Sequence, residues 1–182
     1  MFRRALLITL LAVAPLAAVA QTAPPAVVSG PQAYAPFEVM VGKTWRGKSV
    51  KTAGVEDIQR WEWAIGGHAI RITHSVNGGA YAGETLIFRE KATGDYIYHY
   101  FTTGGFHTTG TIKIVGPGSF EYTETVHGTA QPMTLKTSGI IGADGVYRTR
   151  TQSEKDGQWV EFGGFDYRED PAAVVVMPKV PS

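Results

Sequence analysis

The chain has 182 residues, with 17 Lys and Arg against 16 Asp and Glu, so its formal net charge is +1. A balance this even gives no long-range field that would attract nucleic acid or an anionic membrane surface, and neither is expected as a partner. With 43% hydrophobic and 18% charged residues the chain has the composition of a folded protein. It contains no Cys, which excludes disulfides, thiol nucleophiles and thiolate metal sites.

The N-terminus carries the features of an export signal. Arg3-Arg4 precede an apolar run from Ala5 to Leu16, and the small residues Ala18-Val19-Ala20 follow. This order predicts a signal peptide over residues 1–20, cleaved before Gln21. The apolar run is shorter than the roughly 20 residues of a membrane-spanning helix. We therefore expect an exported protein, periplasmic or secreted, with no membrane attachment after cleavage.

The remaining chain is predicted to form one all-β domain. Residues 21–36 are rich in Ala and Pro and are expected to be a linker, followed by a short helical turn over 35–41. From 37 to 169, short runs of alternating apolar and polar residues are separated by glycine-rich turns. Turns at this spacing are typical of hairpin-connected strands, and we predict a single antiparallel up-and-down barrel of about ten strands. Residues 170–182 are expected to be a tail.

The first hairpin sets the predicted inner and outer faces of the barrel, because a one-residue slip exchanges the two faces. A loop at Gly66-Gly67 places Trp61 and Trp63 on the inner face. The same register pairs Glu62 with Arg71 on the outer face, where opposite charges stabilise a cross-strand pair.

Loop lengths then carry the inner face into the later strands. A three-residue loop at 77–79, a four-residue loop at 91–94 and a two-residue loop at Gly104-Gly105 keep apolar residues inside. In this register the polar side chains expected inside are His74, Glu84, His99, Thr108, Tyr122 and Glu124. Gly110 is predicted to leave space between His99 and Glu124.

Other positions are predicted less completely. The stripe Tyr96, Tyr98 and Tyr100 is expected on the outer face. Arg148 and Arg150 point inward if the preceding loop has four residues and outward if it has three. Gly163-Gly164 is expected to mark a β-bulge in the last strand.

The segment from Phe37 to Trp45, FEVMVGKTW, resembles the start of calycin-type barrels, the lipocalins and fatty-acid-binding proteins. In those families a helical turn leads to a Gly and then to a Trp that plugs the base of the barrel, as Gly42 and Trp45 would here. Two residues separate this pair, instead of the one found in lipocalins. The families also place a basic residue of the last strand over that Trp, and Arg168 is the matching residue. The chain looks closest to uncharacterised lipocalin-like bacterial families, a resemblance that implies a fold and little about activity.

A mainly apolar interior with a few polar groups is typical of a ligand pocket. We therefore expect the barrel to bind a small, partly apolar molecule without catalysis. The residues predicted to line the binding site are Trp61, Trp63, His74, Glu84, His99, Tyr122 and Glu124. No motif identifies a cofactor or an oligomeric state.

Two alternative functions follow from the same residues. The predicted His/Glu cluster has the ligand types of a metal site and the groups for acid–base catalysis, although the sequence contains neither G-x-S-x-G nor H-E-x-x-H. A barrel filled by its own side chains would instead act through its outer tyrosines as an interaction module. Haem-binding barrels of the nitrobindin kind are a further resemblance. Their axial His lies in the C-terminal part of the barrel, whereas the last His here is His127.

Overall fold

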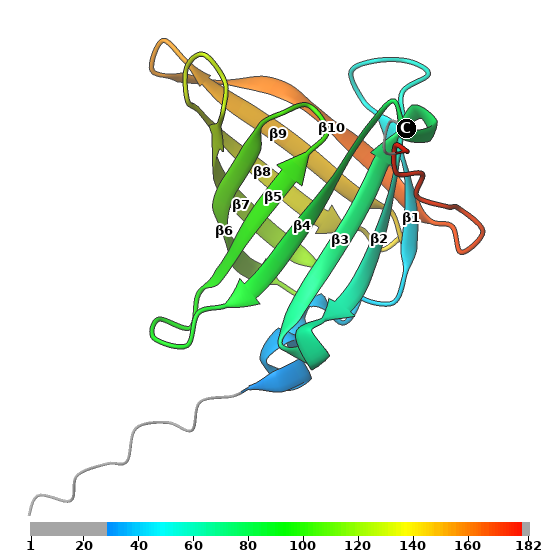
Figure 1. Ribbon diagram of the computed structural model, residues 1–182, viewed down its shortest axis with the longest axis vertical. Coiled ribbons are helices and arrows are strands. Elements are labelled where there is room, and N and C mark those ends of the chain that lie inside the picture. The colour runs from blue at the N-terminus through cyan, green and yellow to red at the C-terminus, as the bar shows by residue number, and fades with distance from the viewer. Residues whose placement is uncertain (1–28, 180–182) are drawn as a thin grey trace, which may run out of the picture.

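The computed structural model describes residues 29–179, and within them ten strands form a closed antiparallel barrel (Figure 1). Each strand pairs with its neighbours in sequence, and β1 pairs with β10 to close the ring. The predicted up-and-down barrel is therefore confirmed. The predicted signal peptide lies outside the described residues. In chain order the elements are η1 (Gly30–Phe37), β1 (Thr44–Ser49), β2 (Glu56–Ala64), η2 (Ile65–Gly67), β3 (Ala69–Val76), η3 (Asn77–Gly79), β4 (Tyr81–Arg89), β5 (Tyr96–Thr102), β6 (His107–Gly116), β7 (Ser119–His127), β8 (Met133–Ile141), β9 (Tyr147–Lys155) and β10 (Gln158–Glu169).

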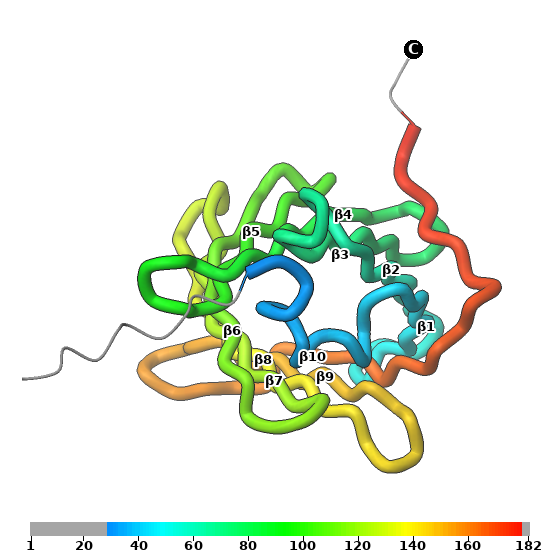
Figure 2. The backbone as a smooth tube through the Cα atoms, turned by 90° about the horizontal axis from the view of Figure 1, so that it is seen from below, coloured from blue at the N-terminus to red at the C-terminus, as the bar shows by residue number. Residues whose placement is uncertain are grey.

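The 3₁₀ helix η1 plugs one end of the barrel. Figure 2 shows this segment lying across the opening, inside the ring of strands. Phe37 is fully buried, and its ring stacks on Phe120 at 5.2 Å between centroids and meets Tyr96 edge-on at 5.0 Å. These aromatic contacts close the base of the barrel with apolar surface.

Hydrogen bonds fasten η1 to the strands. The Tyr34 hydroxyl donates to the carbonyl of His68 at 2.6 Å and accepts from the backbone N–H of Arg89 at 2.9 Å. The Tyr96 hydroxyl donates to the carbonyl of Ala33 at 2.6 Å. The last part of the segment expected to be a linker, from residue 30 to 36, is therefore a part of the core.

Trp45 lies in the base as expected, but its cationic neighbour differs from the prediction. The indole is buried against the Tyr147 ring at 6.2 Å, and the Lys43 ammonium lies 5.6 Å from its centroid. Arg168 is exposed, opposite Arg46 on the neighbouring strand. The prediction that Arg168 lies over Trp45 is therefore wrong. Successive side chains of a strand point to opposite faces, and because Tyr167 points inward, Arg168 points outward.

The first predicted register is confirmed, and the second is wrong by one residue. Glu62 pairs with Arg71 and forms an ion pair at 3.3 Å. After β3, however, Val76 pairs with Tyr81, so the loop has four residues and not three. Asn77 and the two glycines that follow it have φ of 48°, 67° and 96°, a left-handed turn that takes up one more residue. The faces of β4 are therefore exchanged, and Glu84 points outward.

The predicted register between β5 and β6 is also wrong by one residue, and this second error cancels the first. Phe101 pairs with His107, whereas the predicted loop would pair it with Thr108, so the register differs by one residue. Strand β5 thus has Tyr98 and Tyr100 inside and His99 outside, the opposite of the prediction. From β6 onward the predicted faces are correct again, with Glu124 inside.

Strands β8 to β10 complete the wall. Arg148 and Arg150 point outward and form ion pairs with Asp144 at 2.6 Å and Asp166 at 2.8 Å. The register of β10 shifts between Glu161 and Gly163, which confirms the predicted bulge.

Residues 170–179, which follow β10, run along the outside of the barrel. The backbone N–H of Asp170 donates to the carbonyl of Thr44 at 2.9 Å, and that of Val176 donates to Ser75 Oγ at 3.0 Å. This segment therefore covers part of β3, where Ser75 is buried although it faces outward.

Four tyrosines of the described interior lie over glycines of neighbouring strands. A Cβ built on Gly110 would lie 2.7 Å from the Tyr98 ring, and one on Gly83 would overlap the Tyr100 ring. Tyr147 covers Gly139 and Tyr167 covers Gly47 in the same way. The space above Gly110, which the sequence assigned to His99 and Glu124, is therefore occupied by Tyr98.

Replacing Gly110 with Ala should destabilise the fold. The new methyl group would meet both the Tyr98 ring and the carbonyl oxygen of Thr123, and such overpacking costs about 1–3 kcal/mol. Urea unfolding measures the loss. Gly116→Ala is the control, since a Cβ there has no neighbour within 4 Å in the described structure, and its stability should stay within about 1 kcal/mol of the parent. Equal stabilities for the two variants would contradict the packing role of Gly110.

Candidate functional site

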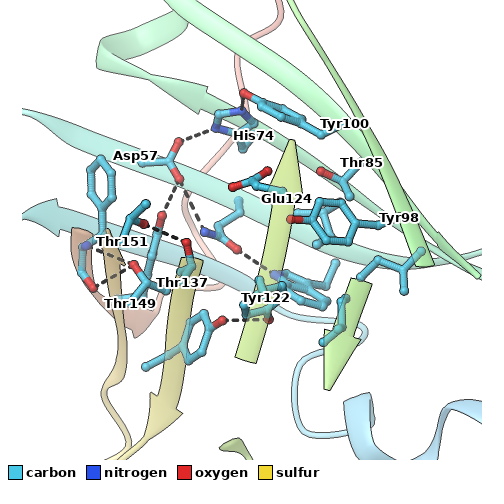
Figure 3. Close-up of a pocket in the computed structure, with 18 of the residues that line it drawn as sticks. Asp57, His74, Thr85, Tyr98, Tyr100, Tyr122, Glu124, Thr137, Thr149 and Thr151 are labelled. Carbon is cyan, nitrogen blue, oxygen red and sulfur yellow. Dashed lines mark hydrogen bonds and ion pairs between the residues drawn. The ribbon is translucent and has the colours of Figure 1, made fainter. Parts of the chain in front are cut away.

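The interior of the barrel contains a cavity of about 340 Å³. Its walls come from strands β2 to β10, and near η1 they are mostly apolar and aromatic, including Trp61, Ile87 and Ile112. Toward the other end they carry carboxylates, hydroxyls and an imidazole, as Figure 3 shows. The cavity is thus an apolar space with polar groups gathered at one end.

A chain of hydrogen bonds crosses the wall from β2 to β5. Asp57 Oδ1 and His74 Nδ1 are 2.8 Å apart, and His74 Nε2 lies 2.7 Å from the Tyr100 hydroxyl. The Tyr100 and Tyr81 hydroxyls are 2.6 Å apart. In either protonation state of the imidazole, both of its ring nitrogens are engaged. His74 therefore has no nitrogen left for a metal ion or a substrate.

Asp57 is the centre of this network. The carboxylate is buried, and its Oδ2 accepts a hydrogen bond from the Tyr167 hydroxyl at 2.8 Å. Gln59 Nε2 lies 3.5 Å from the same oxygen, and Gln59 Oε1 accepts from the Trp61 indole N–H at 2.8 Å. Several donors thus stabilise a buried carboxylate that would otherwise be costly.

Sequence reasoning missed Asp57, although the signal was present. Asp57 and Gln59 alternate with outward residues in the same strand as Trp61, so they share its inner face. The confirmed first hairpin also sets Gln59 opposite His74. The position of Asp57 on the inner face of β2 was therefore predictable from the sequence.

Glu124 is the second carboxylate of the cavity. It lies across β6 from Tyr98, with Gly110 between them in the register, and Thr108 Oγ1 donates to its Oε2 at 2.8 Å. Burial raises the pKa of Glu124, while hydrogen bonds from Thr108 and Tyr98 act in the opposite direction. Desolvation is the larger effect because these donors carry no charge.

The tyrosines of the wall are donors. Burial raises the pKa of Tyr98, Tyr100 and Tyr122, and it raises the pKa of Tyr147 to about 12. Their hydroxyls therefore stay protonated at neutral pH. Tyr122 and Tyr147 bond each other at 3.1 Å between hydroxyl oxygens.

The structure brings together four of the residues predicted for the site. Trp61, His74, Tyr122 and Glu124 line the cavity, and their role in binding stays a prediction. Trp63 lies beyond the cavity at the base, 39% exposed, with its ring edge-on to Tyr34 at 6.1 Å.

Glu84 and His99 are not in the cavity, and their predicted interior position is wrong. Both belong to the two strands whose faces the loop lengths exchange. The His99 ring stacks on Phe88 at 6.1 Å between centroids, on the outer face. The expected His/Glu cluster therefore does not form.

Neither a metal cluster nor a membrane helix is found in the part of the chain that the structure describes. Between residues 29 and 179, no three or more His, Asp or Glu side chains are grouped as a metal ion would require. No helix in the same range is long and apolar enough to cross a membrane.

Comparison with protein-family models gives no match for this chain, and comparison with curated proteins gives none either. The class is therefore defined by the fold and the cavity. The protein is a closed ten-stranded antiparallel barrel, compatible with a calycin-like fold.

Glu124→Gln should change how stability depends on pH. The raised pKa of Glu124 means that the folded state favours the protonated acid. Its contribution to the free energy of unfolding is full below the unfolded pKa of about 4.3 and is lost as pH rises through the folded pKa. The Tm of the Glu124→Gln variant relative to the parent should therefore be higher at about pH 7.5 than at about pH 4, by calorimetry.

Glu121→Gln is the matched control, because Glu121 lies on the outer face of the same strand in an exposed pair with Lys113 at 3.7 Å. It should shift stability by less than about 1 kcal/mol at either pH. A Glu124→Gln variant whose Tm difference from the parent does not change with pH would contradict the buried state of the carboxylate.

Proposed function

We propose that this chain is exported and that its barrel binds a small, partly apolar molecule in the interior cavity, without catalysing a reaction on it. The observation that carries the proposal is the cavity itself. Its volume of about 340 Å³ lies within the range of about 300–1,000 Å³ typical of small-molecule sites. An apolar region with a few polar groups at one end suits a ligand of mixed character.

The bonding within the wall supports binding over catalysis. The imidazole of His74 is held by Asp57 and Tyr100, and buried tyrosines are poor bases because they stay protonated. Polar groups that are fixed by one another give the cavity a rigid polar end, against which a ligand of mixed character can be oriented.

The cavity also favours a binding protein over a filled barrel. The interaction module that we considered from the sequence relied on an outer tyrosine face. Tyr98 and Tyr100, which were expected on that face, line the cavity instead.

Export rests on the N-terminal sequence. A basic pair, an apolar run and the small residues Ala18-Val19-Ala20 form the pattern that a signal peptidase cleaves. A cysteine-free domain is also independent of the oxidising state of the compartment that it enters.

Native mass spectrometry of the protein from its own cells is expected to detect a bound molecule that is released on denaturation. Thr85→Leu should lower its occupancy, because Thr85 lines the cavity and the larger side chain would fill ligand space. The same variant should weaken binding of the neutral probe N-phenylnaphthylamine by at least about tenfold in a fluorescence titration.

Thr111→Leu is the control, since it adds the same side chain at an exposed position of β6. Its probe affinity should match that of the parent. Equal binding by the Thr85 and Thr111 variants would contradict the cavity as the site. A parent protein that carries no extra mass and binds no probe would contradict the binding function.

Intact-mass measurement of the exported protein should give a chain that begins at Gln21. Ala18→Leu and Ala20→Leu together should leave the precursor uncleaved, because the peptidase reads small residues there. A mature chain that still begins at Met1 would contradict the proposed signal peptide.

A further inference from the structure

We infer that the cavity is built for a ligand carrying a positively charged amine, held by the Glu124 carboxylate and the tyrosine rings around it. This inference rests on the proposed binding function and narrows its ligand class. Three observations support it: the negative charge of the cavity wall, the aromatic rings beside Glu124, and the neutral hydrogen-bond partners of the Glu124 carboxylate.

The charges of the wall are negative. Asp57 and Glu124 both line the cavity, whereas no Lys or Arg of the described chain does. Several arginines of the surrounding strands point outward and pair there, as Arg71 does with Glu62 and Arg150 with Asp166. Arg89 lies on the inner face of β4 but outside the cavity lining, at the plugged end, 5.9 Å from the centroid of the Tyr96 ring. An anionic ligand would therefore meet two carboxylates and no cation.

The two carboxylates have different surroundings. Asp57 is bonded to His74 and to the Tyr167 hydroxyl, and Gln59 lies beside it, so its oxygens are already used. Glu124 is held by neutral hydroxyl groups, those of Thr108 and Tyr98. It is thus the cavity carboxylate that lacks a nitrogen donor among the described residues.

Aromatic rings flank Glu124. Tyr98 faces it across Gly110, Tyr122 lies two residues away on the same face of β7, and these two rings are 6.2 Å apart with an interplanar angle of 81°. Figure 3 shows the carboxylate between Tyr98 and Tyr100, directed into the cavity. The faces of aromatic rings attract cations, and ammonium groups are bound in proteins by rings arranged in this way.

An ammonium group would offset the free-energy cost of burying the Glu124 carboxylate. A carboxylate that is removed from water is unfavourable unless an opposite charge joins it, and burial already raises the pKa of Glu124. A ligand amine would supply that charge through a charge-assisted hydrogen bond. The apolar region near Trp61 would receive the rest of the ligand.

Matched probes test this inference by calorimetry. One series is phenethylamine, phenethyl alcohol and hydrocinnamate, and the second is tryptamine, tryptophol and indoleacetate. Within each series the size is similar and the head group is cationic, neutral or anionic. The amine is expected to bind at least about tenfold more tightly than the alcohol, and the carboxylate least.

Glu124→Gln separates a charge effect from a hydrogen-bond effect, since Gln keeps the shape and an amide donor but carries no charge. It should weaken amine binding by at least about tenfold and leave alcohol binding unchanged. Glu121→Gln, on the outer face of the same strand, should leave both unchanged.

The outcomes distinguish the two proposals. An alcohol or carboxylate that binds as tightly as its amine overturns the amine inference and leaves the binding function intact. Unchanged amine affinity in the Glu124→Gln variant also overturns it, because a protonated Glu124 would then act as a neutral donor. If no member of either series binds and the protein carries no bound mass, both proposals fail.

Discussion

The packing of tyrosine rings over glycines gives this barrel its interior. Tyr98, Tyr100, Tyr147 and Tyr167 each lie over a glycine whose Cβ would occupy the position of the ring. A strand glycine normally weakens a sheet, because it has no side chain to pack. Here the neighbouring ring covers that gap, and the hydroxyls of Tyr100, Tyr147 and Tyr167 bond other residues of the wall. The wall is therefore both densely packed and rich in hydroxyl donors, while the centre stays open.

This wall gives the two interior carboxylates different hydrogen-bond partners. Asp57 is hydrogen-bonded by the hydroxyl of Tyr167 and the imidazole of His74, so both of its oxygens have partners within the protein. Glu124 stands opposite Gly110, where the ring of Tyr98 leaves it only hydroxyl partners. One carboxylate thus serves the structure, and the other is the group whose compensation would come from a ligand.

The sequence predicted the barrel and the inner faces of β2, β3, β6 and β7, but it exchanged the faces of β4 and β5. Strand alternation defines two faces reliably, whereas the face that points inward depends on the loop length. Two turns have the same backbone shape, in which the first three residues all have positive φ. They are Ile65-Gly66-Gly67-His68 and Asn77-Gly78-Gly79-Ala80. The common x-Gly-Gly-x pattern was the signal that both loops have four residues. The partners of Asp57 and the position of η1 were not predictable, since they depend on contacts between residues far apart in the chain.

The pairing of β1 with β10 joins the earliest strand of the domain to the last one. Thr44 and Glu169 belong to strands that lie side by side, although more than a hundred residues separate them in sequence. Closing so long a loop costs chain entropy, and contacts of this kind make folding slow. During synthesis, β1 can pair with β2 early, but its other edge lacks a partner until β10 has emerged. Until then the ring has an open seam along β1, and β10, the last strand of the described chain, is the one that closes it.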